Sequence, residues 1–256
     1  MARVAVVTGA SRGIGRGVAA ELAAQGWAVF ATGRSVAGAD LPAVVHRVTC
    51  DHTDDHAVAG ALSLIAGEVA RIDVLVNGVW GGYERMVEDG RFTWGDPFWM
   101  QPTWRWDAMM GAGVRAGFVA SQHVARTMVR QGGGLIVHLS HWAARKHLGN
   151  TIYGMSKAAT DKMAADMAQE LREHDVTVVS LYPGLVRTEA VLAAGVFDLS
   201  NSESPEFIGR AVAALADDEN RIRHSGKAVV AAELAREYGF TDIDGRRPRA
   251  LTSADV

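Results

Sequence analysis

The sequence is poor in cysteine and proline, and charge of neither sign dominates it. Its 256 residues include one cysteine, Cys50, and six prolines. A lone cysteine cannot form an internal disulfide, so the sequence suits a reducing cytoplasm, which is the compartment we expect. A formal net charge of −3 and a pI near 6.3 give no reason to expect nucleic acid or an anionic membrane as a partner.

Long apolar runs and metal-ligand spacings are also missing. No run reaches the roughly 20 residues of a membrane span, and the first residues enter an apolar strand pattern without the charged region of a secretory signal. The nine histidines are dispersed and show no coherent ligand spacing, so we expect no catalytic metal. A chain of this length can bury a large core, and we expect a single domain over residues 1–256.

Strand and helix patterns alternate along the chain. Strands are predicted at residues 4–7, 28–31, 44–50, 72–77, 135–140, 176–182 and 228–231. Helices are predicted at residues 18–25, 54–70, 106–131, 156–173 and 205–216. This alternation predicts an α/β fold in which helices cover both faces of a parallel sheet.

A glycine-rich turn follows the first predicted strand. The turn is Thr8-Gly9-Ala10-Ser11-Arg12-Gly13-Ile14-Gly15, and Gly26 ends the helix after it. Strand, glycine turn, helix and strand within about thirty residues form a dinucleotide-binding unit, so the sheet is expected to be of the doubly wound, Rossmann type. Glycines let the backbone approach a pyrophosphate, whose charge meets the helix N-terminus. The predicted cofactor contacts here are Gly9, Ser11, Arg12, Gly13, Ile14 and Gly15.

Tyr153 and Lys157 stand four residues apart in an Ala-rich helical pattern. On a helix this spacing places both side chains on one face. A phenol titrates near pH ~10, and a neighbouring ammonium group favours the phenolate. We therefore expect Lys157 to lower the pKa of Tyr153, which would act as a general acid or base. Ser140, thirteen residues before Tyr153, completes the set that a carbonyl-reducing or alcohol-oxidising enzyme needs.

The glycine turn, Ser140 and the Tyr-x-x-x-Lys motif at Tyr153 together resemble the short-chain dehydrogenase/reductase family. The resemblance extends over roughly residues 3 to 190. It implies that Ser140 orients the substrate carbonyl, that Tyr153 exchanges a proton with its oxygen, and that Lys157 also holds the nicotinamide ribose. It further implies hydride transfer between substrate and nicotinamide, a step in which positioning supplies much of the acceleration.

Three further segments match motifs of the family. Asp51 matches the residue that contacts the adenine ring, and Leu75-Val76-Asn77 matches the strand leading into Asn-Asn-Ala-Gly. Pro183-Gly184-Leu185-Val186-Arg187-Thr188 matches the segment whose last part meets the nicotinamide carboxamide. The cofactor contacts implied by the resemblance are Asp51, Asn77, Tyr153, Lys157, Pro183, Gly184, Val186 and Thr188.

Segments towards the carboxyl end resemble one subgroup, the one around dehydrogenase/reductase family member one. They are residues 161–166, 180–184, 234–239 and 242–246. The subgroup is associated with NADPH-dependent reduction of steroids and other carbonyl compounds. Relatives usually form dimers or tetramers through the helices predicted at 106–131 and 156–173, so we expect a homodimer or homotetramer.

The end of the second predicted strand favours NADP(H), with NAD(H) as the alternative cofactor. An NAD enzyme places a carboxylate there for the ribose hydroxyls, but this chain has Gly33 followed by Arg34. A carboxylate would repel a 2′-phosphate, whereas a guanidinium group can bind one through two hydrogen bonds. Arg12 can reach the same phosphate in relatives with this pattern.

Three positions depart from the family pattern. Counting along the strand from Val137 places His141 rather than Ser140 in the carbonyl-orienting slot, and imidazole can donate the required hydrogen bond. Both residues stay candidates for substrate binding. Gly113 stands where the family has an Asn that completes a proton relay. Trp80 replaces a small residue beside the nicotinamide and is a third candidate substrate contact.

The segment between Asn77 and Trp106 is longer than in most relatives and contains an aromatic-rich insertion at about residues 80–105. Five of the seven tryptophans lie in this segment: Trp80, Trp94, Trp99, Trp104 and Trp106. Because loops after strand ends surround the ligand crevice, we expect an apolar wall for a bulky substrate. A second wall is expected from the substrate loop at about 189–205. An aromatic pad between subunits is the alternative role of the insertion.

The sequence therefore predicts an NADP(H)-dependent oxidoreductase that reduces a bulky hydrophobic ketone or aldehyde. The alternative is an NADP(H)-binding regulatory or scaffold protein with weak or no catalysis, to which Gly78, Gly113 and the ambiguity between Ser140 and His141 point. The retained Tyr153 favours the enzyme, because cofactor binding alone has less need of a phenol.

Overall fold

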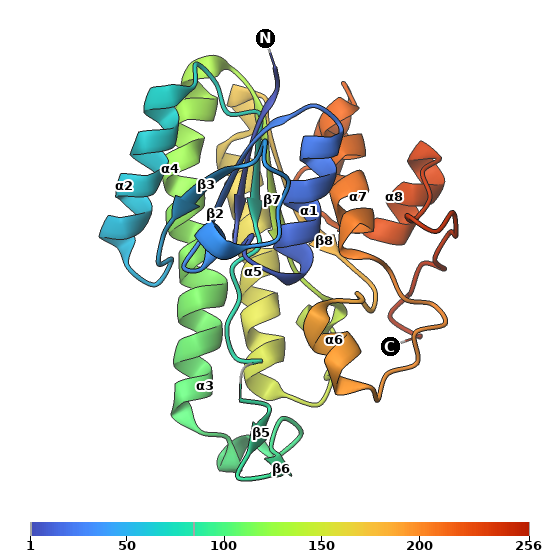
Figure 1. The fold of residues 1–256 in the computed structure, drawn as a ribbon. Coiled ribbons are helices and arrows are strands. Elements are labelled where there is room, and N and C mark those ends of the chain that lie inside the picture. The colour runs from blue at the N-terminus through green and yellow to red at the C-terminus, as the bar shows by residue number, and fades with distance from the viewer. Residues whose placement is uncertain (1, 84, 256) are drawn as a thin grey trace.

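The computed structural model describes residues 2–83 and 85–255; Met1, Val256 and Glu84 of the insertion lie outside the described residues. Seven parallel strands form one sheet in the order β3-β2-β1-β4-β7-β8-β9 (Figure 1). These strands are β1 (Val4–Thr8), β2 (Ala28–Gly33), β3 (His46–Thr49), β4 (Val74–Asn77), β7 (Gly134–Leu139), β8 (Val176–Tyr182) and β9 (Ala228–Val230). The predicted doubly wound, Rossmann-type sheet is confirmed.

Helices cover both faces of the sheet because its central strands are apolar on both sides. Every residue of β1 and β8 is buried, as expected for parallel strands inside an α/β fold. One face packs against α1 (Gly13–Ala24), α7 (Pro205–Asp217) and α8 (Ala231–Tyr238). The other packs against α2 (Asp55–Glu68), α4 (Ala116–Gln131) and α5 (Thr151–Glu170).

Helices α1 and α7 approach each other closely at two glycines. A Cβ on Gly17 would lie 2.2 Å from the Cβ of Pro205, and a Cβ on Gly209 would lie 2.6 Å from that of Glu21. Neither position has room for a larger residue. This contact holds the start of α7, and the loop that leads into it, beside the helix that follows the glycine turn.

The sheet order reverses between β1 and β4, and ligands of such folds bind outside the carboxyl ends of the strands at this point. In Figure 1 the first residues lie at the opposite end of the sheet, while α6 (Glu189–Ala194) and the β5–β6 hairpin extend beyond the carboxyl edge. The predicted glycine turn, aromatic insertion and substrate loop therefore all belong to the carboxyl edge.

The insertion contains structure that the sequence analysis did not predict. Strands β5 (Val87–Glu88) and β6 (Arg91–Phe92) pair antiparallel around Asp89 and Gly90, whose φ values of 50° and 76° are those of a tight hairpin turn. The remaining elements before α4 are η2 (Phe98–Met100), α3 (Thr103–Asp107) and the π-helical segment η3 (Ala108–Arg115). The helix predicted from residue 106 thus begins earlier and has π geometry in its first half.

Two further elements have bounds that differ from the prediction. Helix α5 begins at Thr151, not at 156, because Asn150 Oδ1 accepts a hydrogen bond from the Tyr153 N–H at 2.9 Å and caps the helix. The strand predicted at 228–231 ends at Val230, where the chain enters α8 directly. Short helical turns occur at η1 (Val36–Gly38), η4 (Trp142–Ala144), η5 (Arg172–His174) and η6 (Arg221–His224).

None of the helices in the described residues is long and apolar enough to cross a membrane. Within the same residues, no three His, Cys, Asp or Glu side chains gather as a group that could hold a metal ion. Burial raises the pKa of the Cys50 thiol to about 11, and Asp51 and Asp54 add to the rise. The thiol is therefore protonated and unreactive at neutral pH.

Candidate active site

The glycine turn brings two backbone segments into close contact at the carboxyl end of β1. Gly9 has a φ of 68°, and a Cβ there would lie 2.6 Å from the carbonyl oxygen of Gly78. A Cβ on Gly15 would lie 2.5 Å from the carbonyl oxygen of Gly9. Only glycine fits these positions, and the tight turn leaves the amino end of α1 at the crevice. Arg12, the N-cap residue, provides no side-chain cap for it.

A carboxylate lies on this amino end of α1. The Gly13 N–H donates to Glu189 Oε2 at 2.9 Å, and Arg16 Nη2 lies 3.0 Å from Glu189 Oε1. Glu189 is the first residue of α6, in the loop after β8. An anionic group therefore already binds where the glycine motif predicts the pyrophosphate of a cofactor. No sequence motif pointed to this role of Glu189.

The end of β2 presents positive charge. A Cβ on Gly33 would lie 2.6 Å from Ser11 Oγ, so an acidic side chain has no room there while Ser11 keeps its place. Arg34 follows and is exposed. The neighbouring Asp51 accepts hydrogen bonds from the N–H and Oγ1 of Thr53 at 2.9 and 2.8 Å, and these bonds, with a smaller contribution from Arg34, lower the pKa of Asp51.

Tyr153 lies in the first turn of α5 at the centre of a cluster of rings. It is only 7% exposed. The ring centroids of Trp80, Trp94 and His141 lie 5.6, 5.3 and 5.6 Å from its own. The ring centroid of Tyr83 lies 6.2 Å from that of Tyr153. The predicted proton-transfer residue is thus at the carboxyl edge, where side chains of the insertion cover it.

Lys157 is buried one turn further along α5. Its Nζ donates to the carbonyl oxygen of Leu139 at 3.1 Å and lies 3.9 Å from the centroid of the Trp80 ring. The distance from Nζ to the centroid of the Tyr153 ring is 5.7 Å. Burial lowers the pKa of Lys157 to about 7. The motif therefore brings phenol and amine together on one face of α5.

The expected effect of Lys157 on the acidity of Tyr153 is wrong for this structure. Burial raises the pKa of Tyr153 well above its ordinary value near 10, and Tyr83 adds to the rise. Desolvation dominates because the Lys157 ammonium group is directed at the Leu139 carbonyl and the Trp80 ring. Tyr153 therefore keeps its proton at neutral pH, but the raised pKa makes it a weaker acid than an exposed phenol.

The two candidates for orienting a carbonyl occupy different places. Ser140 is 3% exposed, and its Oγ donates to the backbone carbonyl oxygen of Lys157 at 3.4 Å. His141 lies beside Tyr153, and its Nδ1 accepts a hydrogen bond from the Ala143 N–H at 3.2 Å. The imidazole ring therefore contacts the phenol ring, while the serine hydroxyl contacts the backbone of α5.

Trp80 and Gly113, two positions that depart from the family pattern, pack against each other. A Cβ on Gly113 would lie 2.7 Å from Cζ3 of Trp80. The indole ring therefore fills the space that a side chain at position 113 would need. Gly113 in η3 is what allows the Trp80 ring to lie over Lys157.

Seven large aromatic or apolar side chains of the insertion form an inner and an outer set. The inner set, Trp80, Tyr83 and Trp94, has ring contacts with Tyr153. The outer set is 58–71% exposed and consists of Phe92, Phe98, Trp99 and Met100. The inner set has the position expected of a pocket wall, and the outer set has the exposure expected of an aromatic pad.

Arg105 holds the insertion together, and Asn150 fastens it to α5. The guanidinium group of Arg105 is fully buried and donates to the Arg85 carbonyl oxygen at 3.0 Å and to Thr93 Oγ1 at 2.9 Å. Asn150, the N-cap residue of α5, donates through Nδ2 to the Trp94 carbonyl oxygen at 2.9 Å. The insertion is therefore tied to the helix that carries Tyr153.

Asn77, a predicted cofactor contact, is buried at the end of β4. Its Nδ2 donates to Ser121 Oγ at 2.9 Å and lies 3.4 Å from His138 Nδ1. Its Oδ1 has no hydrogen-bond partner in the part of the chain that the structure describes. Burial lowers the pKa of His138 to about 4, so this ring is neutral at pH 7. The amide of Asn77 is thus engaged with α4 and β7.

The predicted nicotinamide segment after β8 is held by a buried carboxylate. The Gly184 N–H donates to Glu203 Oε2 at 2.8 Å, and burial raises the pKa of Glu203 to about 7. Pro183 and Val186 are buried in this segment. Thr188 ends it as the N-cap residue of α6.

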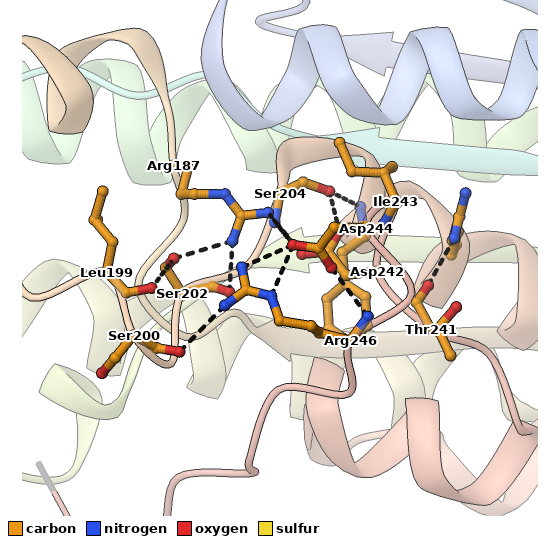
Figure 2. A network of polar contacts seen from close by, with 12 residues as sticks. Arg187, Leu199, Ser200, Ser202, Ser204, Thr241, Asp242, Ile243, Asp244 and Arg246 are labelled. Carbon is orange, nitrogen blue, oxygen red and sulfur yellow. Dashed lines mark hydrogen bonds and ion pairs between the residues drawn. The ribbon is translucent and has the colours of Figure 1, made fainter.

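Figure 2 shows the hydrogen bonds and ion pairs by which residues near the carboxyl end of the chain hold this loop in place. Asp242 is 1% exposed, and its Oδ2 accepts hydrogen bonds from Arg187 Nη2 and from the Ser204 N–H, both at 2.9 Å. Arg187 Nη1 also donates to the Ser202 carbonyl oxygen at 2.7 Å. Segment 242–246, which carries part of the subgroup resemblance, therefore fixes the loop that leads to Glu189 at one end and to α7 at the other.

Comparison with known proteins assigns the chain to a family. A family model described as short chain dehydrogenase matches residues 3–195. The chain belongs to the short-chain dehydrogenase/reductase family, whose members are oxidoreductases that use NAD(P)(H).

The narrower resemblance to one subgroup is also confirmed. Dehydrogenase/reductase SDR family member 1 of Mus musculus is 40% identical to this chain, over 95% of this chain and 84% of its own length. The protein of the same name from Homo sapiens is 38% identical with the same coverage. The short-chain reductase protein NovJ of Streptomyces niveus is 35% identical over 73% of this chain and 71% of its own.

Solved structures share the fold. A short-chain dehydrogenase/reductase from Burkholderia xenovorans superposes with a TM-score of 0.71 at 25% identity, covering 89% of this chain and 94% of its own. Acetoin dehydrogenase YohF from Salmonella typhimurium gives the same TM-score at 23% identity, over 90% of this chain and 94% of its own. The second likeness concerns the fold alone.

Proposed function

We propose that the chain is a single-domain, cytoplasmic NADP(H)-dependent enzyme that reduces a bulky hydrophobic ketone or aldehyde. The observation that carries this proposal is the position of a protonated Tyr153 beside Lys157 at the carboxyl edge of the sheet. A phenol is protonated at neutral pH and has a proton that it can give to a carbonyl oxygen.

The residues of the glycine turn fit a dinucleotide. Gly9 and Gly15 have no space for a side chain because backbone atoms pack against both, and the resulting tight turn leaves the amino end of α1 at the crevice for a pyrophosphate. The Gly13 N–H already binds one carboxylate, that of Glu189. Bound NADP(H) would supply the hydride. The remaining proposed contacts are Ser11, Arg12, Ile14, Arg34, Asp51, Asn77, Lys157, Pro183, Gly184, Val186 and Thr188.

The charge at the end of β2 supports NADP(H) over NAD(H). Arg34 is exposed there, and Gly33 provides no carboxylate of the kind that an NAD enzyme uses. A guanidinium group can bind the 2′-phosphate through two hydrogen bonds. Tighter binding of NADH than of NADPH would contradict this preference.

The inner aromatic set supports a bulky substrate. Trp80 and Trp94 contact Tyr153 and present flat apolar surfaces on which a ring system could stack. The nicotinamide ribose could reach Lys157 only after the Trp80 ring moves, because that ring lies 3.9 Å from Nζ. Binding of cofactor and opening of the aromatic cluster are therefore coupled in the proposed cycle.

Oxidation of NADPH across a panel of carbonyl compounds tests the function. The panel should pair short aliphatic ketones with large aromatic and polycyclic ones, and a titration of NADPH binding should accompany it. Higher kcat/KM for the large compounds is expected. Equal efficiency across the panel would contradict the role of the inner aromatic set without removing the enzyme assignment.

A second candidate is an NADP(H)-binding regulatory or scaffold protein with weak or no catalysis. The covering of Lys157 by the Trp80 ring favours it, because the site as it stands is closed. Tight NADPH binding without turnover of any compound on the panel would select this candidate.

Substitution of Glu189 by Gln is expected to strengthen NADP(H) binding. The Glu189 carboxylate competes with the pyrophosphate for the Gly13 N–H and for Arg16. Removing one negative charge at a helix N-terminus predicts a decrease in Kd of about two- to tenfold. Isothermal titration measures the change, and Glu173→Gln, on η5, is the matched control. Weaker binding by the Glu189 variant would mean that this carboxylate belongs to the cofactor site instead of competing for it.

We also propose that the chain forms a homodimer or homotetramer through α4 and α5. Phe118 on α4 and Met155 on α5 are 48% and 46% exposed, and an interface would bury both. Light scattering measures the mass in solution, and a monomer would contradict the proposal.

A further inference from the structure

We propose that His141, in place of Ser140, is the catalytic residue that orients the substrate carbonyl, by donating a hydrogen bond from its Nε2–H to the carbonyl oxygen. The inference rests on the proposed function, the reduction of a carbonyl compound with Tyr153 as proton donor. Counting along the sequence leaves both residues open, but the contacts of their side chains differ.

His141 has the required position. It lies two residues beyond the end of β7, at the carboxyl edge of the sheet, and its ring centroid lies 5.6 Å from that of Tyr153 with the two planes at 45°. A carbonyl oxygen that accepts a proton from Tyr153 must lie within about 3 Å of its hydroxyl. In our proposal, such an oxygen lies between the phenol and the neighbouring imidazole.

Ser140 has a different set of contacts. Its Oγ donates to the Lys157 carbonyl oxygen at 3.4 Å, and its N–H donates to the Leu181 carbonyl oxygen at 2.9 Å. A serine hydroxyl has one proton to donate, and here that proton is directed at the backbone of α5. Ser140 therefore joins the end of β7 to α5 and to β8.

The backbone after His141 selects the tautomer of the ring. The Ala143 N–H donates to Nδ1 at 3.2 Å, so Nδ1 is an acceptor and the proton of the neutral ring is on Nε2. Burial, together with the charge of Lys157, lowers the pKa of His141 to about 4, which keeps the ring neutral at pH 7. No hydrogen bond to Nε2 is found among residues 2–83 and 85–255, so this N–H is available to a ligand.

This arrangement assigns each proton and electron pair of the step. Bound NADPH would supply the hydride for the new C–H bond at the carbonyl carbon and would become NADP⁺, and the C=O π electrons would move to oxygen. Tyr153 would give its proton to that oxygen, which completes the alcohol. His141 keeps its own proton throughout and stabilises the negative charge that develops on oxygen, as donors of an oxyanion hole do.

Substitutions at the two positions, assayed with the best carbonyl substrate of the panel, test the proposal. His141→Phe keeps a ring of similar size without the donor and is expected to lower kcat by about 10²- to 10³-fold. His141→Asn retains an N–H donor and an acceptor for the Ala143 N–H, so it should recover much of that loss. Ser140→Ala should retain turnover close to that of the unmodified protein. NADPH binding, measured by titration, should stay the same in all three variants.

The outcomes separate this inference from the proposed function. Loss of turnover in Ser140→Ala, with His141→Phe remaining active, would overturn the role of His141 and leave the enzyme assignment intact. An unmodified protein that binds NADPH but reduces nothing on the panel would overturn the proposed function and, with it, this role. A low kcat in His141→Phe that His141→Asn does not improve would also count against a hydrogen-bond donor at this position.

Discussion

The Tyr153→Phe variant is expected to lose about 10²- to 10⁴-fold in kcat while its affinity for NADP(H) stays close to that of the unmodified protein. The substitution removes only the hydroxyl, whose proton would pass to the carbonyl oxygen. The ring stays, so its packing against Trp80, Trp94 and His141 is retained. Steady-state oxidation of NADPH measures the first quantity, and titration of NADPH fluorescence measures the second.

Tyr238→Phe is the matched control. Tyr238 is the last residue of α8, which lies on the opposite face of the sheet from α5, and its hydroxyl donates to Asp218 Oδ2 at 2.6 Å. Loss of this hydroxyl should therefore leave kcat unchanged. A Tyr153→Phe enzyme that kept most of its activity would show that another group, such as the hydroxyl of Tyr83, delivers the proton. Loss of NADPH binding in the same variant would instead show that the phenol holds the cofactor.

Most of the fold could be predicted because its signals are local. The strands of the sheet are short apolar runs, and the glycine turn marks the first crossover to a helix. The sequence contained signals for two features that we did not predict, the β5–β6 hairpin and the start of α5 at Thr151. The pair Asp89-Gly90 is typical of a tight hairpin, and Asn150 before Thr151 is typical of a helix start. Thr188 is a similar signal, because it caps α6, the helix at the start of the substrate loop.

The candidate site was predictable only where its residues are close in sequence. Tyr153 and Lys157 come together because a helix places residues four apart on one face. The acidity of Tyr153 could not be predicted, since it depends on burial by Trp80 and Tyr83 from a distant segment. The contact of Glu189 with the glycine turn is likewise a meeting of two loops, with no periodic pattern to indicate it.

Restoring the family's Asn at position 113 is expected to destabilise the protein. In this chain the Trp80 ring occupies the space of that side chain, with Cζ3 2.7 Å from a Cβ placed on Gly113. Gly113→Asn must therefore displace the indole or shift η3, and overpacking of this kind costs about 1–3 kcal/mol in the free energy of unfolding. Chemical denaturation measures the loss.

Gly111→Asn is the matched control for this prediction, because Gly111 is in the same π-helical segment and a Cβ there would meet nothing within 4 Å. It should be neutral or slightly stabilising, since Asn has a better helix propensity than Gly. The steric cause is isolated by introducing Gly113→Asn into a Trp80→Ala background, where its cost should largely disappear and give a coupling energy of about 0.5–3 kcal/mol. An unchanged cost in that background would mean that the π segment itself, and not the indole, requires glycine. A vanished cost would establish that Trp80 and Gly113 form one unit, so that the absence of the family's Asn follows from the presence of the tryptophan.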